Sequence, residues 1–300
     1  MTEKKSLGPD FIGIGTMKSA SGWIFKCLRE HPEVSNKNIK ELYFFNNPFN
    51  YKKGINTYYS IFRKSPKNSI KGEYTPSYML NPEVAFLIHK HFPDVKIIAC
   101  LRNPAERAYS DYRYNIQENG RFTRYNGFED TINKDQKFVE RGFYYKQLKS
   151  YFELFPRENI LILFYEDLVK DPIKFIEDVH RFLGLKNVNY KPSLLNRKLS
   201  ITGSYIIKYK LPILNSLIYW LDSKIKNTSK LRKLIDKSGL ENYLLRLRQF
   251  NRMKIIGKNE NVFSIPPLRA STRSYLLNHI YKEDINKLEK LLNKDLSFWK

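Results

Sequence analysis

Short apolar runs, each followed by a turn and an amphipathic segment, recur along the first two thirds of the chain. Three of these runs, at 11–14, 95–101 and 160–165, predict buried β-strands. The segments that follow the strands carry apolar side chains at helical spacing. This alternation predicts an α/β fold with a central parallel sheet of about five strands, flanked by helices in three layers.

The loop after the first strand combines small residues with a lysine. It runs from Thr16 to Gly22 and leads into a helix whose apolar face includes Trp23. Free backbone N–H groups and the positive dipole end at the start of a helix attract anions. Lys18 adds a full charge and two serines add hydroxyl donors, so the loop predicts a phosphate site. The nucleotide triphosphatase motif differs, because its lysine comes late in the loop. An ordinary strand-to-helix turn is the alternative interpretation.

A second motif begins where the strand at 95–101 ends. Asn103 and Pro104 predict the cap and the first position of a helix. Arg102 therefore stands at the carboxyl end of a strand, where ligands of parallel sheets collect, and Ser110 follows about two helical turns into the helix. A guanidinium binds phosphate bidentately. Because a cation is unfavourable beside the positive end of a helix, an anion between the two would explain this arginine.

Together the two motifs resemble those of sulfotransferases that use 3′-phosphoadenosine 5′-phosphosulfate (PAPS). The run 18–23 is similar to the family's Lys-Ser/Thr-Gly-Thr-Thr-Trp loop, with Ala20 where Gly is usual and Gly22 where the second Thr is usual. Since alanine has a Cβ, Ala20 requires a negative φ or tolerates mild strain. The resemblance implies that the loop binds the 5′-phosphate of PAPS, and that Arg102 and Ser110 bind its 3′-phosphate.

The resemblance also implies an adenine site and a late basic loop. Trp23 matches an adenine-stacking Trp of cytosolic members, and Tyr165 lies in a Phe-Tyr-Glu-Asp-Leu segment whose Tyr lies near the adenine. Core packing is the alternative for both rings. The stretch 266–273 stands where the family has a loop that closes over the 3′-phosphate, although it contains no Arg-Gly or Lys-Gly pair. The predicted donor-binding residues are Lys18, Ser19, Ala20, Ser21, Gly22, Trp23, Arg102, Ser110, Tyr165, Arg269 and Arg273.

Sulfuryl transfer needs a base for the acceptor proton and a positive charge at the leaving group. The segment 40–45, Lys-Glu-Leu-Tyr-Phe-Phe, resembles the Lys-Glu-x-His-Phe-Phe motif of the Golgi glycan sulfotransferases, in which the Glu acts as base. The resemblance implies Glu41 as the base, Lys18 at the bridging oxygen and Lys40 in contact with donor or acceptor. Tyr43 replaces the His, whose supporting role is therefore lost or altered.

A second candidate base is Glu73. It lies in a segment similar to the family's Glu-Lys-Ser/Thr-Pro-x-Tyr, with Tyr74 in place of the second lysine, so a helper charge is missing or comes from elsewhere. The alternative for Glu41 is an exposed loop acid, and the alternative for Glu73 is an acid that caps a turn. The five histidines have no metal-ligand spacing, so we expect structural roles for them and no bound metal. Cys27 and Cys100 lie in apolar runs, which predicts buried free thiols in a reducing compartment.

The net charge of +23 exceeds what capture of PAPS alone requires, so an anionic acceptor, a carrier protein, a membrane or nucleic acid could share the explanation. Residues 205–260 hold 13 Lys or Arg and 4 Asp or Glu, and include an apolar run at 211–221 that is too short to span a bilayer. We expect one sulfotransferase domain, 1–300, with a basic helical insert on the acceptor side at about 200–260. An interfacial surface that meets lipid or a lipid-linked acceptor is the sharper interpretation of this insert.

The sequence therefore predicts a P-loop-like fold and transfer of the sulfuryl group from PAPS to a hydroxyl of a carbohydrate or glycolipid, a lipid-linked glycan or a small metabolite. No apolar signal stretch stands at the amino terminus, so we expect a cytoplasmic protein, with peripheral contact at the inner membrane surface as an option. One alternative is a P-loop kinase or NTPase, which would need a Lys-Ser/Thr loop ending and an acid for Mg²⁺. The other is a non-catalytic basic protein that binds membrane or nucleic acid, although no nucleic-acid motif is present.

Overall fold

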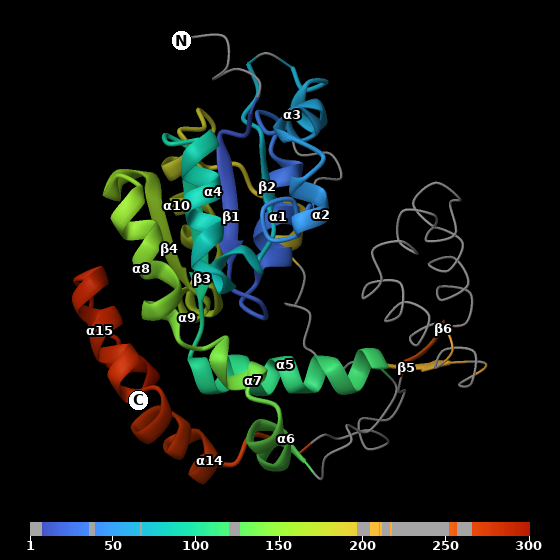
Figure 1. The fold of residues 1–300 in the computed structure, drawn as a ribbon, viewed down its shortest axis with the longest axis vertical. Coiled ribbons are helices and arrows are strands. Elements are labelled where there is room, and N and C mark those ends of the chain that lie inside the picture. Colours follow the sequence, from blue (N-terminus) through green and yellow to red (C-terminus); the bar gives the residue numbers. More distant parts are fainter. Residues whose placement is uncertain are drawn as a thin grey trace. The chain divides into compact units, whose positions relative to one another are not determined.

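The structure is a computed structural model, and it places the chain in two compact units (Figure 1). It describes residues 8–35, 40–66, 68–119, 127–196, 205–209, 211, 217, 252–256 and 266–300. The first unit comprises Met1–Asp111, Ile132–Leu199 and Leu268–Lys300, and the second comprises Tyr112–Thr131 and Ser200–Pro267.

The first unit is built on a four-stranded parallel sheet. Its strands are β1 (Phe11–Gly15), β2 (Gly72–Tyr74), β3 (Lys96–Leu101) and β4 (Ile160–Phe164), in the order β2-β1-β3-β4. All three pairings are parallel, so the carboxyl ends of the strands meet at one edge of the sheet. The α/β class and the three predicted strands are confirmed. The sheet contains four strands among the described residues, where about five were expected.

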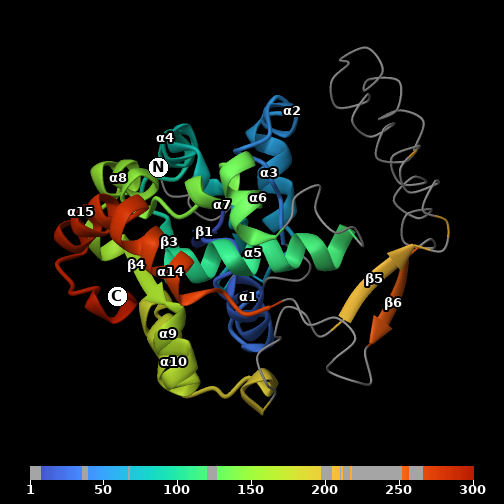
Figure 2. The same cartoon turned by 90° about the horizontal axis from the view of Figure 1, so that it is seen from below.

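Helices cover both faces of this sheet (Figure 2). The helices α4 (Pro82–His91) and α8 (Tyr144–Leu154) lie on one face, and α15 (Lys282–Leu292) packs against α8. The helices α1 (Ser21–Glu30), α9 (Tyr165–Lys170) and α10 (Pro172–Leu183) lie on the other face. This arrangement gives the predicted three layers. The remaining helical elements of the described chain are α2 (Pro48–Tyr51), α3 (Ile55–Phe62), η2 (Tyr78–Leu80), α5 (Pro104–Asn119), α6 (Phe128–Lys134), α7 (Lys137–Glu140), η3 (Arg157–Asn159), η4 (Ser193–Asn196), α14 (Ala270–Tyr275), η5 (Leu276–Ile280) and η6 (Ser297–Trp299).

Side-chain caps fix the helix that follows β3 and the last helix on the α1 face. Asn103 Oδ1 accepts the N–H groups of Ala105 and Glu106 at 3.0 and 3.2 Å, which sets the start of α5 where the sequence predicts it. Asp171 caps α10 in the same way, and Gly184, with φ of 76°, ends that helix. Asn103 thereby fixes the path of the chain where it leaves the carboxyl end of β3.

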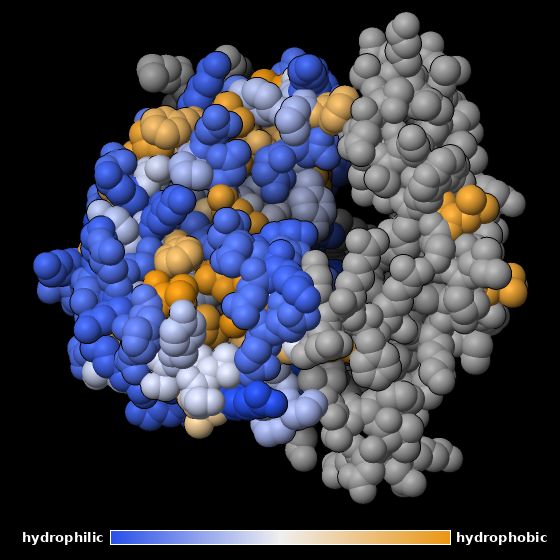
Figure 3. Space-filling view, turned by 60° about the horizontal axis from the view of Figure 1, so that its bottom comes forward, coloured by the Kyte–Doolittle hydropathy of each residue, from blue (hydrophilic) through white to orange (hydrophobic). Residues whose placement is uncertain are grey.

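The interior of the first unit is mainly apolar, and the buried arginine Arg107 is paired with a buried carboxylate. Arg107 and Asp111 are both almost fully buried, and Asp111 Oδ2 lies 3.3 Å from Arg107 Nη1 and 2.7 Å from Arg141 Nη1. Cys27 and Cys100 are buried and free, as predicted. The face shown in Figure 3 is mainly hydrophilic, with small apolar patches between charged side chains.

The second unit contains a two-stranded antiparallel sheet. In it β5 (Tyr205–Tyr209) pairs with β6 (Arg252–Ile256), and Tyr205 stands opposite Ile256. A helical insert was predicted here, but β5 contains two isoleucines and two tyrosines and β6 contains two isoleucines, and these residue types favour extended structure. The apolar run 211–221 and most of the basic stretch lie outside the described residues. The single-domain organisation and the lipid-facing surface therefore stay predictions.

Candidate functional site: a phosphate loop and an adjoining carboxylate

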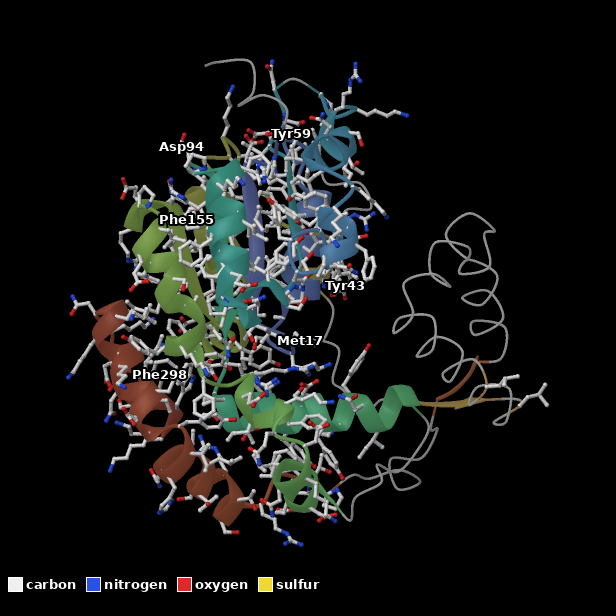
Figure 4. All side chains as sticks on the ribbon, viewed as in Figure 1. Met17, Tyr43, Tyr59, Asp94, Phe155 and Phe298 are labelled. Carbon is white, nitrogen blue, oxygen red and sulfur yellow. The ribbon has the colours of Figure 1, made fainter. Side chains whose placement is uncertain are left out.

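The loop between β1 and α1 lies at the carboxyl end of the sheet. Met17, labelled in Figure 4, marks the loop beyond the end of β1. Lys18 and Ala20 both have positive φ, 69° and 63°. Ala20 thus adopts the strained conformation, which costs an L-residue about 1–2 kcal/mol, rather than a negative φ. The helix α1 then begins at Ser21 with no acidic residue in its first turn, so its positive end can attract an anion.

Two hydroxyl groups of this loop are buried without a hydrogen-bond partner among the described residues. They are Thr16 Oγ1 and Ser19 Oγ. Since buried polar groups in folded proteins are nearly always bonded, this pair fits a ligand that carries oxygen acceptors, such as a phosphate. Ser19 was predicted from the sequence, whereas Thr16 was not. The feature that could have identified Thr16 is its position as the first residue after the strand.

Tyr74 stands where the resemblance predicts a lysine. It contacts the end of β1, just before the loop, and it carries no charge. A Cβ at Gly13 would lie only 2.2 Å from Tyr74 Cδ2, so the ring needs a glycine beside it. The Tyr74 hydroxyl donates to the carbonyl of Gly15 at 2.8 Å. Complete burial raises the pKa of this phenol, which therefore stays neutral.

Arg102 lies at the carboxyl end of β3 and reaches the phosphate loop. Its Nη1 donates to the carbonyl of Lys18 at 3.4 Å, and its guanidinium carbon lies 4.5 Å from the centroid of the Tyr165 ring. Tyr144 holds it from behind, by donating to the carbonyl of Arg102 at 2.8 Å. The structure thus brings three predicted donor-site residues together. Ser110 is buried within α5, at the helical position that its spacing predicts.

Trp23, a predicted donor-binding residue, has a structural partner. Trp23 is half-buried and meets Phe175 of α10 edge-on, with ring centroids 6.0 Å apart. This contact fits the core-packing alternative for that tryptophan.

The late basic stretch was predicted as a loop to residue 273, and this is wrong: from Ala270 on it forms α14, with the exposed Arg269 at the N-cap. No Gly or Pro follows Pro267 to interrupt a helix there. Arg273 pairs with Glu106 at 3.5 Å and donates to the carbonyl of Trp299 at 2.7 Å. It therefore ties the carboxyl-terminal turn to α5.

The segment 40–45 connects Glu41 with the phosphate loop through its neighbour Lys40. Lys40 Nζ lies 3.8 Å from Glu41 Oε1 and 3.5 Å from the position that a Cβ would occupy at Gly22. The ammonium group of Lys40 therefore lies beside Gly22, at the start of α1. Burial lowers the pKa of Lys40, and the charge of Glu41 opposes this effect. The arrangement places a cation, missing at position 74, beside the loop.

Tyr43 makes a direct contact with the candidate base. Its hydroxyl donates to Glu41 Oε2. The side chain of Glu41 is 27% exposed and that of Tyr43, labelled in Figure 4, also reaches solvent. Asn50 holds the backbone here by donating to the carbonyl of Tyr43 at 3.2 Å. At position 43 a tyrosine hydroxyl, in place of a histidine, thus contacts the candidate base. The sequence pattern did not reveal this contact.

Glu73, the second candidate base, is fully buried in β2 and not at a turn. The hydroxyls of Tyr58, Thr75 and Tyr78 donate to its carboxylate. Burial raises the pKa of Glu73 to about 7, although these hydrogen bonds oppose the rise. Its position and partners differ from those of a group that meets an acceptor from solvent.

The described residues hold no group of three or more His, Cys, Asp or Glu that could bind a metal ion. The histidines have intramolecular partners: His31 contacts the carbonyl of Asn187 at 2.9 Å, and its ring lies 4.7 Å from that of His180. These contacts fit the structural roles predicted for them. In the same part of the chain, no helix has both the length and the apolar character needed to cross a bilayer.

The fold and this site define the chain as an α/β protein in which the loop after β1 and the end of the neighbouring strand β3 meet at the carbonyl of Lys18. The sulfotransferase domain family matches residues 8–200, and the chain belongs to this family. The chain is 27% identical over 320 residues to the membrane-associated sulfotransferase kil1 of Dictyostelium discoideum, covering 97% of this chain and 66% of that protein.

Other relatives act on a named class of molecule. The chain is 31% identical over 186 residues to heparan sulfate glucosamine 3-O-sulfotransferase 5 of Mus musculus, covering 59% of this chain and 54% of that protein. The chain thus spans from about half to just under two thirds of the length of these relatives. A solved sulfotransferase structure from Alicyclobacillus acidocaldarius superimposes with a TM-score of 0.67 at 20% identity, over 97% of this chain and 98% of that one. It shows a shared fold.

Proposed function

We propose that this protein transfers the sulfuryl group from PAPS to an acceptor hydroxyl and releases adenosine 3′,5′-bisphosphate (PAP). The observation that carries the proposal is the convergence of the phosphate loop and Arg102, which meet at the carbonyl of Lys18, in a chain of the sulfotransferase family. Family membership favours this function over the kinase or NTPase and over the non-catalytic basic protein considered above.

The residues at the loop fit the phosphates of PAPS. Thr16 and Ser19 offer buried hydroxyls that have no hydrogen-bond partner among the described residues, and the start of α1 offers backbone N–H groups to the 5′-phosphate. The guanidinium of Arg102 and the hydroxyl of Ser110 are the groups that we propose to bind the 3′-phosphate. The contact of this guanidinium with the Tyr165 ring supports an adenine site beside it.

In the proposed reaction, a bond forms between the acceptor oxygen and sulfur while the bond between sulfur and the bridging phosphate oxygen breaks. Glu41 takes the proton of the acceptor hydroxyl, and its partial exposure allows an acceptor to reach it. The electron pair goes to the leaving phosphate, where Lys18 stabilises the negative charge. Lys40, held between Glu41 and Gly22, supplies a second positive charge beside the loop.

We propose a carbohydrate hydroxyl as the acceptor. The Lys-Glu-x-x-Phe-Phe segment and the heparan sulfate sulfotransferases among the relatives support this choice. A cytoplasmic location and membrane contact through 205–260 stay proposals, and binding of vesicles that contain anionic lipid would test the second.

The test is turnover with PAPS as donor and heparan sulfate as the acceptor probe, followed by mass spectrometry of the product. We expect sulfated product and equimolar PAP from the wild type, and a loss of about 10²–10⁴ in turnover for Glu41→Gln. Lys18→Ala should abolish turnover. Glu83→Gln, at an exposed first-turn acid of α4, is the matched control and should retain wild-type turnover. Turnover that survives Lys18→Ala would contradict the mechanism.

A further inference from the structure

A buried carboxylate that the proposed mechanism does not use lies under the segment 40–45. Glu73 has no solvent exposure, and three hydroxyls surround it. Tyr58 and Tyr78 donate to its Oε1 at 2.9 and 2.8 Å, and Thr75 donates to its Oε2 at 2.6 Å. No Lys or Arg forms an ion pair with Glu73 in the part of the chain that the structure describes.

The carboxylate determines which way these hydroxyls point. An ionised carboxylate only accepts hydrogen bonds, and a hydroxyl has a single hydrogen to donate. The hydrogens of Thr75 and Tyr78 are therefore committed to Glu73, and their oxygens are left to accept. Thr75 Oγ1 accepts the N–H of Leu42 at 3.0 Å, and Tyr78 Oη accepts the N–H of Phe44 at 3.0 Å.

These two bonds fix the backbone on both sides of Tyr43. The same short stretch carries Lys40 and Glu41, so its path decides where the candidate base and its neighbouring cation stand. Phe44 and Phe45 anchor the stretch from below through ring contacts with Tyr58, at centroid distances of 4.8 and 5.0 Å. The ring contacts hold the segment by packing, whereas the hydrogen bonds to the hydroxyls fix the positions of individual backbone N–H groups.

We propose that ionised Glu73 is a positioning residue: it orients the hydroxyls of Thr75 and Tyr78 so that they hold the segment 40–45 and thereby place Glu41. This inference rests on the proposed role of Glu41 as the base. It assigns the second carboxylate of the site a task other than proton transfer, because both oxygens of Glu73 are occupied by protein hydroxyls and Glu41 alone of the two reaches solvent.

Protonation of Glu73 would disturb this arrangement. A neutral carboxyl donates its one hydrogen to the oxygen of a neighbouring hydroxyl, so that hydroxyl must turn its own hydrogen away. At Thr75 or Tyr78, the carboxyl hydrogen then competes with a backbone N–H for the same hydroxyl oxygen. The groups that face the carboxylate are the hydroxyls of Tyr58 from α3, Thr75 after β2 and Tyr78 from η2, together with the backbone N–H of Leu42, and none of them carries a charge near pH 7. With the pKa of Glu73 raised to about 7, the positioning effect should strengthen as pH rises above neutrality.

Two tyrosines provide a matched pair of variants. Tyr58→Phe and Tyr78→Phe each remove one buried hydroxyl bonded to Glu73 Oε1 and keep the ring. Only the hydroxyl of Tyr78 also holds a backbone N–H of the segment 40–45. Thr75→Ser keeps the hydroxyl at the third position and Thr75→Val removes it, which gives a conservative rescue.

The first readout is hydrogen–deuterium exchange of the peptide that covers 40–46, measured at pH 8 on the full chain. We expect Glu73→Gln, Tyr78→Phe and Thr75→Val to speed exchange of the Leu42 and Phe44 amides about ten-fold or more, the effect of losing one hydrogen bond in a local opening. Tyr58→Phe and Thr75→Ser should stay close to the wild type. Equal acceleration in the two tyrosine variants would overturn the proposal, because a general loss of packing acts on both alike.

The second readout is turnover of PAPS with heparan sulfate, with PAP binding measured on the same samples. The three variants that free the amides should lower kcat about ten-fold and leave PAP affinity unchanged, since Glu73 does not touch the phosphate loop. The wild-type kcat should rise between about pH 6 and 8, and the kcat of Glu73→Gln should be low and flat over that range. A Glu73→Gln variant with abolished turnover and unchanged exchange would assign proton transfer to Glu73 and overturn the proposal. If the wild type neither binds PAP nor turns over PAPS, the proposed function fails, and the exchange comparison still decides the positioning claim.

Discussion

Glu73→Gln should make the protein more stable relative to the wild type as pH rises, even though it should lower activity. The change replaces a buried titrating carboxyl by a neutral amide of similar shape. Glutamine cannot ionise, so the variant lacks the one group in this network whose charge state depends on pH near neutrality. All other titrating groups are shared, so their contributions cancel in the comparison.

The size of the effect follows from burial. Removal from water raises the pKa of Glu73 from 4.5 to about 7 in the folded protein. Between these two pH values the folded state keeps a proton that the unfolded state has lost, so the free energy of unfolding falls as pH rises through this range. Since a change of one in pKa is worth about 1.4 kcal/mol, the full loss is about 3 kcal/mol. It is complete once pH exceeds about 7, and it is absent below about 4.5.

Urea unfolding of both proteins, followed by circular dichroism at several pH values between about 5 and 8.5, measures this quantity. We expect the free energy of unfolding of Glu73→Gln minus that of the wild type to increase by about 2.5 kcal/mol across this range, because part of the full change takes place below pH 5. Asp178→Asn, at an exposed ion pair with Lys174, is the control and should show no comparable trend. A difference that stays flat from pH 5 to 8.5 would refute the reasoning, because it would mean that Glu73 ionises equally easily in the folded and unfolded protein.

Three other changes test separate parts of the account. Arg102→Ala should weaken PAP binding by about 1.5–3 kcal/mol, the range for a hydrogen bond to a charged group, whereas Arg157→Ala, which removes a guanidinium stacked on Phe152 before β4, should leave binding unchanged in calorimetry. Ala20→Gly should raise the melting temperature, because it removes the strain of a positive φ, worth about 1 kcal/mol. The control Ala108→Gly, within α5, should lower it. A lower melting temperature for Ala20→Gly would contradict the inference that Ala20 is strained. Asp111→Asn should reduce the free energy of unfolding by about 3–5 kcal/mol, because it leaves Arg107 buried without its counter-charge, and a loss below about 1 kcal/mol in urea titrations would contradict that pairing.

Local signals in the sequence were sufficient for the main elements of the first unit. The strands at β1, β3 and β4 are long apolar runs, and the caps Asn103 and Asp171 use side-chain chemistry that acts within three residues. Such signals do not depend on distant partners. The spacing of Arg102 and Ser110 could be interpreted because both follow one strand end.

Elements that depend on distant partners were missed. The strand β2 has only three residues, one of them glycine, and it is recognisable only by its pairing with β1. The turn from loop to helix at Ala270 likewise has no strong capping residue.

Contacts between side chains far apart in the chain were also out of reach. The bond between Tyr43 and Glu41 depends on rotamers, and the network around Glu73 joins α3, β2 and η2 with the segment 40–45. The approach of Lys40 to Gly22 depends on the same tertiary path. For the second unit, isoleucine-rich segments at β5 and β6 carried a strand signal that the basic charge pattern obscured.

The most direct measurement of the central claim is thermal unfolding of the full chain with PAP, compared with ATP and AMP at the same concentrations. A ligand at 100 times its dissociation constant adds about 2.7 kcal/mol to the free energy of unfolding, which shifts the melting temperature by several degrees. The account predicts a large shift with PAP and a much smaller one with ATP or AMP, because Arg102 and Ser110 are assigned to a 3′-phosphate that the other two lack. No shift with PAP, or an equal shift with ATP, would contradict the assignment of this site to PAPS.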